Sequence, residues 1–193
     1  MARQKDIIIT HDVNGNLVFT QAKTDLDPLI SFDFKNGMIP GTNFSHNFDG
    51  RAMYSHITVV GQASADGGNA RQATIRNPYV PVFYRPKVVT MSSGQDTDAQ
   101  DAAQRELAKE LEGLTLSINT DRWEIDGKII KPNNIIEILA PELYIYSKSD
   151  FFIRSIDFVG DEKETTASIN CILPEVVNGK YPVSIFEGIN MHP

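Results

Sequence analysis

Apolar and polar residues alternate through the second half of the chain, and this pattern constrains the fold more than any other feature. In residues 167–173, Ala, Ile, Cys and Leu occupy every second position, with Ser and Asn between them. Residues 114–118 (Leu-Thr-Leu-Ser-Ile) repeat the pattern. A period of two places successive side chains on opposite faces of a β-strand. We therefore expect strands that bury one face.

Turn sequences predict that these strands are joined into hairpins. Asn14-Gly15 and Asp126-Gly127 are strong hairpin signals, because both residues of such a pair tolerate the positive φ of a tight turn. Residues 151–173 predict a further hairpin around a charged loop. Several short strands within residues 114–173 favour a small antiparallel β-barrel, closed or nearly closed.

The first half of the chain combines strands with irregular segments. Residues 51–61 predict one strand, rich in β-branched and aromatic side chains. Residues 79–91 also favour extended structure. Three prolines lie in or next to this region, Pro78, Pro81 and Pro86. Proline has no backbone N–H to donate to a ladder, so we expect an edge strand or an extended segment and not a central strand.

One amphipathic helix is predicted over residues 98–112. Thr97 and Gln100 have the spacing of a capping box, with Thr97 as the N-cap, and Gly113 provides a C-terminal stop. The helix is expected to pack closely against a sheet or another helix, because its apolar face is rich in alanine. That face consists of Ala99, Ala102, Ala103, Leu107 and Leu111.

Together these patterns predict a β-rich α+β chain, with an N-terminal antiparallel sheet and one packed helix followed by a small antiparallel β-barrel. We divide the chain into an α+β domain (1–113), a barrel-like domain (114–174) and a C-terminal arm or tail (175–193). Regular alternation ends at Pro174, which is why the last division is placed there.

Composition excludes several classes of protein. Hydrophobic residues make up 41% and charged residues 22%, as in ordinary globular proteins. The formal net charge of −7 disfavours general binding to nucleic acid, because acidic surfaces repel phosphate. The single cysteine, Cys171, cannot form a disulfide framework or a zinc site with several cysteines. No apolar stretch approaches the ~18 residues of a membrane-spanning helix.

We predict no catalytic residue, no metal site and no cofactor. None of the four histidines (His11, His46, His56 and His192) has the spacing of a metal-ligand pair. Cys171 alternates with apolar neighbours, so we expect it to be a small buried hydrophobic residue.

Two groups of residues leave alternatives open. The carboxylate pairs Glu124 with Asp126 and Glu137 with Glu142 could in principle serve a glycosidase, but spacing in the sequence does not establish the required geometry. Trp123, the only tryptophan, could offer an aromatic platform to a sugar or a base. A single tryptophan beside a turn more often caps a core.

The order of these features resembles that of a known family. The matching segments are residues 16–20 after the first turn, 49–62 ending in Val-Val-Gly-Gln, the helix from Ala99-Gln100, 126–138 with Gly-Lys-Ile-Ile-Lys-Pro-Asn, and the closing hairpin with Leu173-Pro174. This order is similar to that of the hub protein of Mu-like contractile phages, often described as a late-control or tail protein. The resemblance covers roughly residues 14–174. Family members usually carry more sequence before the first hairpin, so the chain is either a fragment or a shortened hub.

The resemblance implies a mechanical, non-enzymatic role. Family hubs form a trimeric ring that adapts the three-fold spike to the six-fold tail tube. We therefore expect a homotrimer in the tail baseplate of the virion, assembled in the host cytoplasm, with tail spike, tail tube or baseplate proteins as partners. We expect no membrane partner and no sequence-specific nucleic acid, although phage DNA would pass through the ring. The negative charge suits an inner wall enriched in Asp and Glu.

The sequence is also compatible with two other functions. The predicted barrel could be an oligosaccharide- or oligonucleotide-binding module, since small barrels often bind such ligands. The chain could also be a cell-wall hydrolase that accompanies a tail. Exposed aromatic side chains around Trp123 would favour the binding module.

Overall fold

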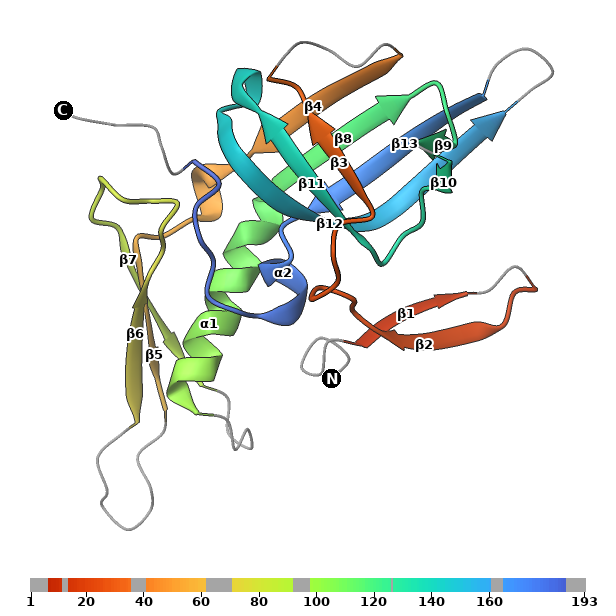
Figure 1. The fold of residues 1–193 in the computed structure, drawn as a ribbon. Helices are drawn as coiled ribbons and strands as arrows, with labels where there is room; N and C mark the ends of the chain where they lie inside the picture. Colours follow the sequence, from red (N-terminus) through yellow and green to blue (C-terminus); the bar gives the residue numbers. More distant parts are fainter. Residues whose placement is uncertain are drawn as a thin grey trace.

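The centre of the molecule is a strongly curved, six-stranded sheet (Figure 1). The computed structural model describes residues 7–11, 14–35, 41–61, 71–91, 98–125, 127–160 and 165–186. The strand order is β3-β11-β12-β13-β8-β4, with β3 parallel to β11 and all other neighbours antiparallel. The strands are β3 (Ile30–Asp33), β4 (Thr42–Phe48), β8 (Leu114–Thr120), β11 (Ile135–Ala140), β12 (Ile145–Gly160) and β13 (Thr165–Ile172).

The α+β class is confirmed, but the predicted closure of residues 114–173 into a barrel is wrong. Among the described residues no ladder joins the two edge strands, β3 and β4. Closure would require β8 to pair with β11. Each instead takes its outer neighbour from the first half of the chain, β4 beside β8 and β3 beside β11. The curvature brings only side chains together, with the rings of Phe34 and Phe44 at a centroid distance of 3.9 Å.

The sheets do not follow the predicted boundary after residue 113. Strands β4 and β8 are direct partners, with Phe48 opposite Leu114, and the N–H of Asp49 donates to the carbonyl of Gly113 at 3.0 Å. Residues 50–113 are therefore inserted between two adjacent strands of one sheet, and we call them the insert. The three-part division of the chain into folding units remains a prediction.

The insert is a three-stranded sheet packed against one helix. Its strand order is β6-β5-β7, so β7 lies at an edge as predicted for that proline-rich region, and β5 is central. The predicted strand at 51–61 is shorter than expected, because a 3-10 turn at Gly50–Ala52 precedes it. The elements are β5 (His56–Val60), β6 (Gln72–Arg76), β7 (Pro86–Thr90) and α1 (Ala99–Glu110), which a 3-10 turn (Leu111–Gly113) follows.

Helix α1 confirms the predicted amphipathic helix. Its buried stripe has a spacing of four residues, which keeps side chains on one face of a helix. The N-cap is Asp98, whose carboxylate accepts from the N–H of Gln100, so the cap lies one residue later than predicted. Thr97 lies outside the described residues. The stripe consists of Ala99, Ala103, Leu107 and Leu111.

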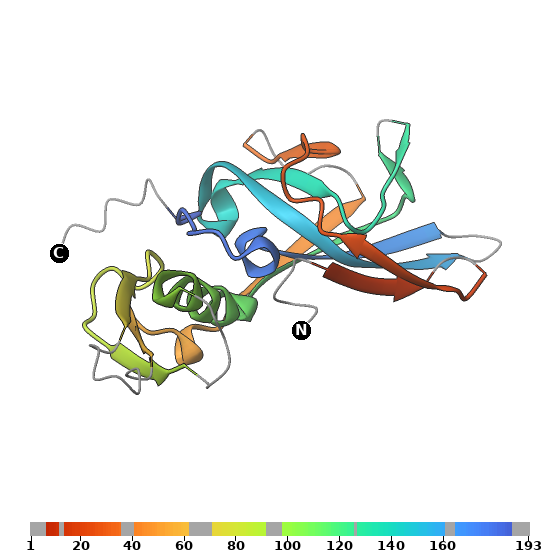
Figure 2. The same ribbon diagram turned by 90° about the horizontal axis from the view of Figure 1, so that it is seen from below.

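Two small hairpins form at the predicted turns. Gly15 and Gly127 have φ values of 80° and 72°, the left-handed conformation that favours glycine. The first hairpin lies on the same side of the molecule as β12 and β13, away from the insert (Figure 2). The hairpins are β1 (Ile7–His11) with β2 (Leu17–Gln21), and β9 (Glu124–Ile125) with β10 (Lys128–Ile129).

The described part of the predicted C-terminal arm is packed on the body. A short helix, α2 (Glu175–Asn178), is followed by an extended segment that reaches the insert. The hydroxyl of Tyr79 donates to the carbonyl of Val183 and accepts from the N–H of Ile185, which is itself buried. Residues 175–186 therefore fasten the insert to the rest of the chain.

We expect Leu107→Ala to lower the free energy of unfolding by roughly 2–5 kcal/mol, because it removes a fully buried side chain between α1 and its sheet. Urea denaturation followed by circular dichroism measures the effect. The exposed Gln100→Ala on the same helix is the control and should change stability by about 0.5 kcal/mol or less. Equal midpoints for the two variants would contradict the packing described here.

Candidate functional site

The residue types that most often carry metal or catalytic chemistry are dispersed. His46 lies in β4 and His56 in β5. Cys171 is buried in β13 as predicted, and burial raises the pKa of its thiol to about 12. The side chain of His11 and all of His192 lie outside the described residues. Within the described part of the chain, no three His, Cys, Asp or Glu side chains are grouped as metal ligands would be.

The carboxylates considered for glycosidase chemistry are not arranged for it. Glu137 on β11 accepts a hydrogen bond from the hydroxyl of Ser31 and pairs with the ammonium of Lys148, both at 2.7 Å. The bond to Lys148 is the largest cause of a lowered pKa at Glu137, whereas a general acid requires a raised pKa. The remaining members of the predicted pairs are Glu142, exposed in the turn after β11, Glu124, exposed in β9, and Asp126, outside the described residues.

Trp123 holds the end of the sheet together. Its indole N–H donates to the carbonyl of Thr166 at 3.0 Å, and its ring meets Phe158 edge-on at a centroid distance of 5.6 Å. Gly160 lies against the ring, since a Cβ added there would come within 2.6 Å of the indole Cζ2. Trp123 is still 41% exposed, and Phe158 is exposed beside it. Thr166 and Gly160 hold the indole in place, whereas the exposed Phe158 beside it is the kind of neighbour that favours a binding module.

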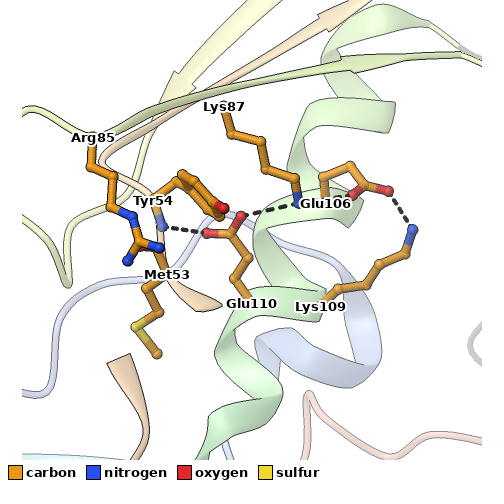
Figure 3. A network of polar contacts seen from close by, with 7 residues as sticks. All are labelled: Met53, Tyr54, Arg85, Lys87, Glu106, Lys109 and Glu110. Atoms are coloured by element: carbon orange, nitrogen blue, oxygen red, sulfur yellow. Dashed lines mark hydrogen bonds and ion pairs between the residues drawn. The ribbon is translucent and has the colours of Figure 1, made fainter. Parts of the chain in front are cut away.

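A buried carboxylate joins α1 to the three-stranded sheet (Figure 3). The Oε2 atom of Glu110 accepts from the backbone N–H of Tyr54 at 2.9 Å, and its Oε1 lies 3.4 Å from the ammonium of Lys87. Lys87 also pairs with Glu106 at 3.6 Å, and Glu106 binds Lys109. This network connects the last turns of the helix to β7 and to the segment that leads into β5.

Burial is the largest influence on Glu110 and raises its pKa. The Tyr54 N–H, the charge and hydrogen bond of Lys87 and the side chain of Asn77 act in the opposite direction. A carboxylate that is desolvated but paired in this way is costly to unpair, because the remaining buried charge would have no partner. Its position between helix and sheet indicates a structural role.

The ring of Tyr54 lies between two cations. The guanidinium carbon of Arg85 is 4.5 Å from the ring centroid, and the ammonium of Lys87 is 5.5 Å from it. Arg85 also donates to the carbonyl of Met53, and its backbone N–H donates to the hydroxyl of Ser55 at 2.7 Å. These contacts fix the two chain segments that enter β5 and β7.

This network of charged side chains was not predicted from the sequence. One signal was present, because Glu110 follows Leu107 by three residues and so borders the apolar face of the helix. A charged residue at that position predicts a buried partner. Its partners, Tyr54 and Lys87, are far away in sequence and lack any motif.

Large apolar side chains are exposed in several regions, and such surfaces commonly mark contacts with other proteins. In the β1–β2 hairpin, Ile9 and Phe19 are direct partners and both are exposed. None of the described helices is long and apolar enough to cross a membrane. The main exposed groups are Ile7, Ile9, Leu17 and Phe19 on this hairpin, Val82, Phe83 and Tyr84 before β7, and Phe158 and Val159 at the end of β12.

We expect the stability of the wild type, relative to Glu110→Gln, to fall as pH rises from about 4.3, the ordinary pKa of glutamate, through the raised pKa of Glu110. The raised pKa means that the folded state binds the proton more tightly than the unfolded state, so deprotonation in this range disfavours folding. The amide variant keeps an acceptor for Tyr54 and cannot titrate. Urea midpoints at several pH values measure the difference, with the exposed Glu142→Gln as the control. A difference that is constant with pH would contradict the assignment.

We expect Gly160→Ala to displace the ring of Trp123 toward water, because the added methyl group would overlap the indole. The emission of the single tryptophan should shift to longer wavelength, and loss of the bond to Thr166 should cost about 1 kcal/mol of stability. The exposed Gln100→Ala on α1 serves as a control for the emission spectrum. An unchanged spectrum for Gly160→Ala would be inconsistent with this packing.

Comparison with known proteins identifies the fold. No family model matches the chain, and no curated protein matches it. The 43 kDa tail protein of prophage MuSo2 from Shewanella oneidensis matches with a TM-score of 0.66 and 21% identity, over 91% of this chain and 52% of that one. The tail protein from Neisseria meningitidis MC58 matches with a TM-score of 0.68 and 20% identity, over 94% and 55%.

A more distant match is the prophage tail protein gp18 from Listeria monocytogenes EGD-e, with a TM-score of 0.51 and 12% identity over 89% of this chain and 49% of that one. The chain therefore spans about half the length of the solved proteins that it matches. At these identities the likeness concerns the fold. Over nearly its whole length, the chain has the fold found in these tail proteins, as the resemblance in its sequence predicts.

Proposed function

We propose that the chain is a non-enzymatic structural protein of a contractile phage tail, and that it forms the central hub ring of the baseplate between the tail tube and the spike. The observation that carries the proposal is the match in fold to the tail proteins from S. oneidensis and N. meningitidis over 91% and 94% of the chain. The order of sequence motifs supports the same role independently of the fold.

A hub acts by holding neighbours in place, so its working parts are contact surfaces on a rigid body. One hydrophobic core runs through the six-stranded sheet and the insert, and it includes Met53, Leu107, Leu116 and Ile138. The exposed apolar side chains of the hairpin and loops lie outside that core. This combination suits a protein whose surface is completed by other subunits.

The ring is a homotrimer located in the tail baseplate of the virion, with spike, tube or baseplate proteins as partners. Phage DNA passes through it during ejection. The net charge of −7 supports this part of the proposal, because an acidic wall repels phosphate, whereas a basic wall would bind it by releasing counterions. We expect the inner wall to carry more Asp and Glu than Lys and Arg.

The alternatives have less support. A sugar- or oligonucleotide-binding module would use Trp123 and the exposed Phe158 beside it as a platform, but the indole N–H and part of the indole ring are engaged by Thr166 and Gly160. A cell-wall hydrolase would need a carboxylic acid that stays protonated, and among the carboxylates predicted for that role the pKa of Glu137 is lowered by Lys148. A peptidoglycan zymogram tests the hydrolase directly.

The proposal predicts that gold-labelled antibodies against the chain decorate the end of the tail that meets the host, at the junction of tube and spike. Electron microscopy of purified tails measures the position, and tails from a strain that lacks the gene are the control. Native mass spectrometry should find three copies in the isolated baseplate centre. Labelling along the sheath or on the capsid would exclude a hub.

A further inference from the structure

Strand β4 is an open edge of the six-stranded sheet. The N–H of Asp49 donates to Gly113 and the N–H of Asp121 donates to Gly41, so the odd-numbered residues from 41 to 49 direct their backbone groups toward β8. The backbone N–H and C=O groups of the alternate residues point away from the sheet. They belong to Thr42, Phe44, His46 and Phe48. Thr42 is buried, so the accessible part of the edge runs from Phe44 to Phe48, and in the described structure no hydrogen bond engages its outward groups.

This edge lacks the features that normally prevent strands of different molecules from pairing. Natural edge strands are protected by charge, proline, bulges or short length. Strand β4 has seven residues (Thr-Asn-Phe-Ser-His-Asn-Phe) with an unbroken register and neither a charged residue nor a proline. Burial lowers the pKa of His46, which keeps its imidazole neutral at physiological pH.

Three other edges are protected. Strand β3 has four residues and ends in Asp33, β6 ends in Arg76, and β7 begins with Pro86-Lys87. The comparison within one chain shows that β4 differs from these edges in sequence as well as in length. Its free backbone groups are therefore suited to accept another strand.

The β1–β2 hairpin is the second surface without a partner. Both of its strands are uncharged, and a two-stranded sheet alone is marginally stable in water. One face contacts the body through Ile8. The opposite face carries Ile7, Ile9, Leu17 and Phe19, which are 36%, 51%, 60% and 65% exposed.

We propose that the β1–β2 hairpin of one copy adds to the β4 edge of a neighbouring copy, so that the six-stranded sheet continues from one molecule into the next. Each copy carries a net charge of −7, and identical acidic chains repel each other. A contact made from uncharged strands on both sides avoids placing like charges together. Backbone hydrogen bonds provide the affinity, as in other cases of strand addition.

The placement of the two surfaces suits a ring. In Figure 1, β4 lies along the upper border of the six-stranded sheet, and the hairpin lies below β12 and β13. A contact between two different patches of identical chains is heterologous and can close into a ring. Pairing of β4 with a second β4 would be isologous, would produce a dimer and would leave the hairpin exposed. The inference rests on the proposed hub ring, for which it names the contact between subunits.

The test is the oligomeric state of the full chain, measured by analytical ultracentrifugation over a range of concentrations and by native mass spectrometry. His46→Pro removes an outward N–H in the middle of β4 and keeps the ladder with β8, which does not use that group. His46→Ala loses the same imidazole and retains the N–H. We expect the wild type and His46→Ala to form trimers. His46→Pro should form trimers only at a protein concentration that is higher by about tenfold or more.

Two further pairs keep the test decisive should the proline impair folding. Phe19→Glu places a charge on the hairpin, and Val183→Glu places one at a similarly exposed apolar site elsewhere, at 65% and 67% exposure. Asn43→Lys and Asn119→Lys lie directly opposite each other on β4 and β8, and both are exposed, but only the first is on the edge. We expect Phe19→Glu and Asn43→Lys to weaken assembly and their controls to assemble normally.

The outcomes separate this contact from the proposed function. Wild-type trimers that tolerate His46→Pro, Phe19→Glu and Asn43→Lys would overturn the contact and leave the hub ring standing. A wild-type dimer, or a monomer at every concentration, would also overturn it, while the position of the gold label in the tail still tests the hub. Trimers that are weakened by edge and hairpin substitutions, and not by the controls, would support it.

Discussion

The pairing of β4 with β8 is the interaction on which the rest of the structure depends. It closes a long segment of chain, the insert, into a loop whose ends meet at Asp49 and Gly113. A side chain at Gly113 would have its Cβ 2.9 Å from the carbonyl oxygen of Asp49, so the close approach of the two backbones requires glycine. Closing a longer loop adds little entropy cost, because that cost grows only with the logarithm of length.

Strand β8 also supplies the centre of the core. Leu114, Leu116 and Ile118 are fully buried, and the strand has neighbours on both sides, β13 and β4. Strand β8 directly follows the 3-10 turn that ends α1, so the helix of the insert and the six-stranded sheet are joined without a linker. Strand β8 thus pairs with β4, contributes buried side chains to the core and continues from α1.

Local features of the fold were predictable from the sequence, and pairings between distant segments were not. The helix, the turns at Gly15 and Gly127 and the alternation in β8 and β13 all follow from short-range rules. Strand β4 is rich in Asn and Ser, so its sequence alone resembles an irregular segment, and only β8 beside it makes it a strand. The barrel prediction failed for the same reason, because nothing local indicates that β3 and β4 join the later strands.

The absence of a catalytic group stays a prediction. The charged network was missed because its members are distant in sequence. One buried carboxylate, Glu110, ties α1 to the three-stranded sheet through Lys87 and the Tyr54 N–H. The open edge of β4 and the strands of the first hairpin carry no charged residue. These uncharged strands stand out on an otherwise charged surface and are suited to contacts with other chains.

The adjacent ends of the insert give the architecture a modular character. The ladder requires that Phe48 and Leu114 remain side by side, and the segment between them must also complete the hydrophobic core that the sheet and the insert share. Units of different size could be exchanged at this junction over evolution while the ladder, and any assembly built on it, kept its geometry. The same junction is a graft point for a foreign domain with neighbouring termini, if that domain also covers the part of the core that the insert now covers.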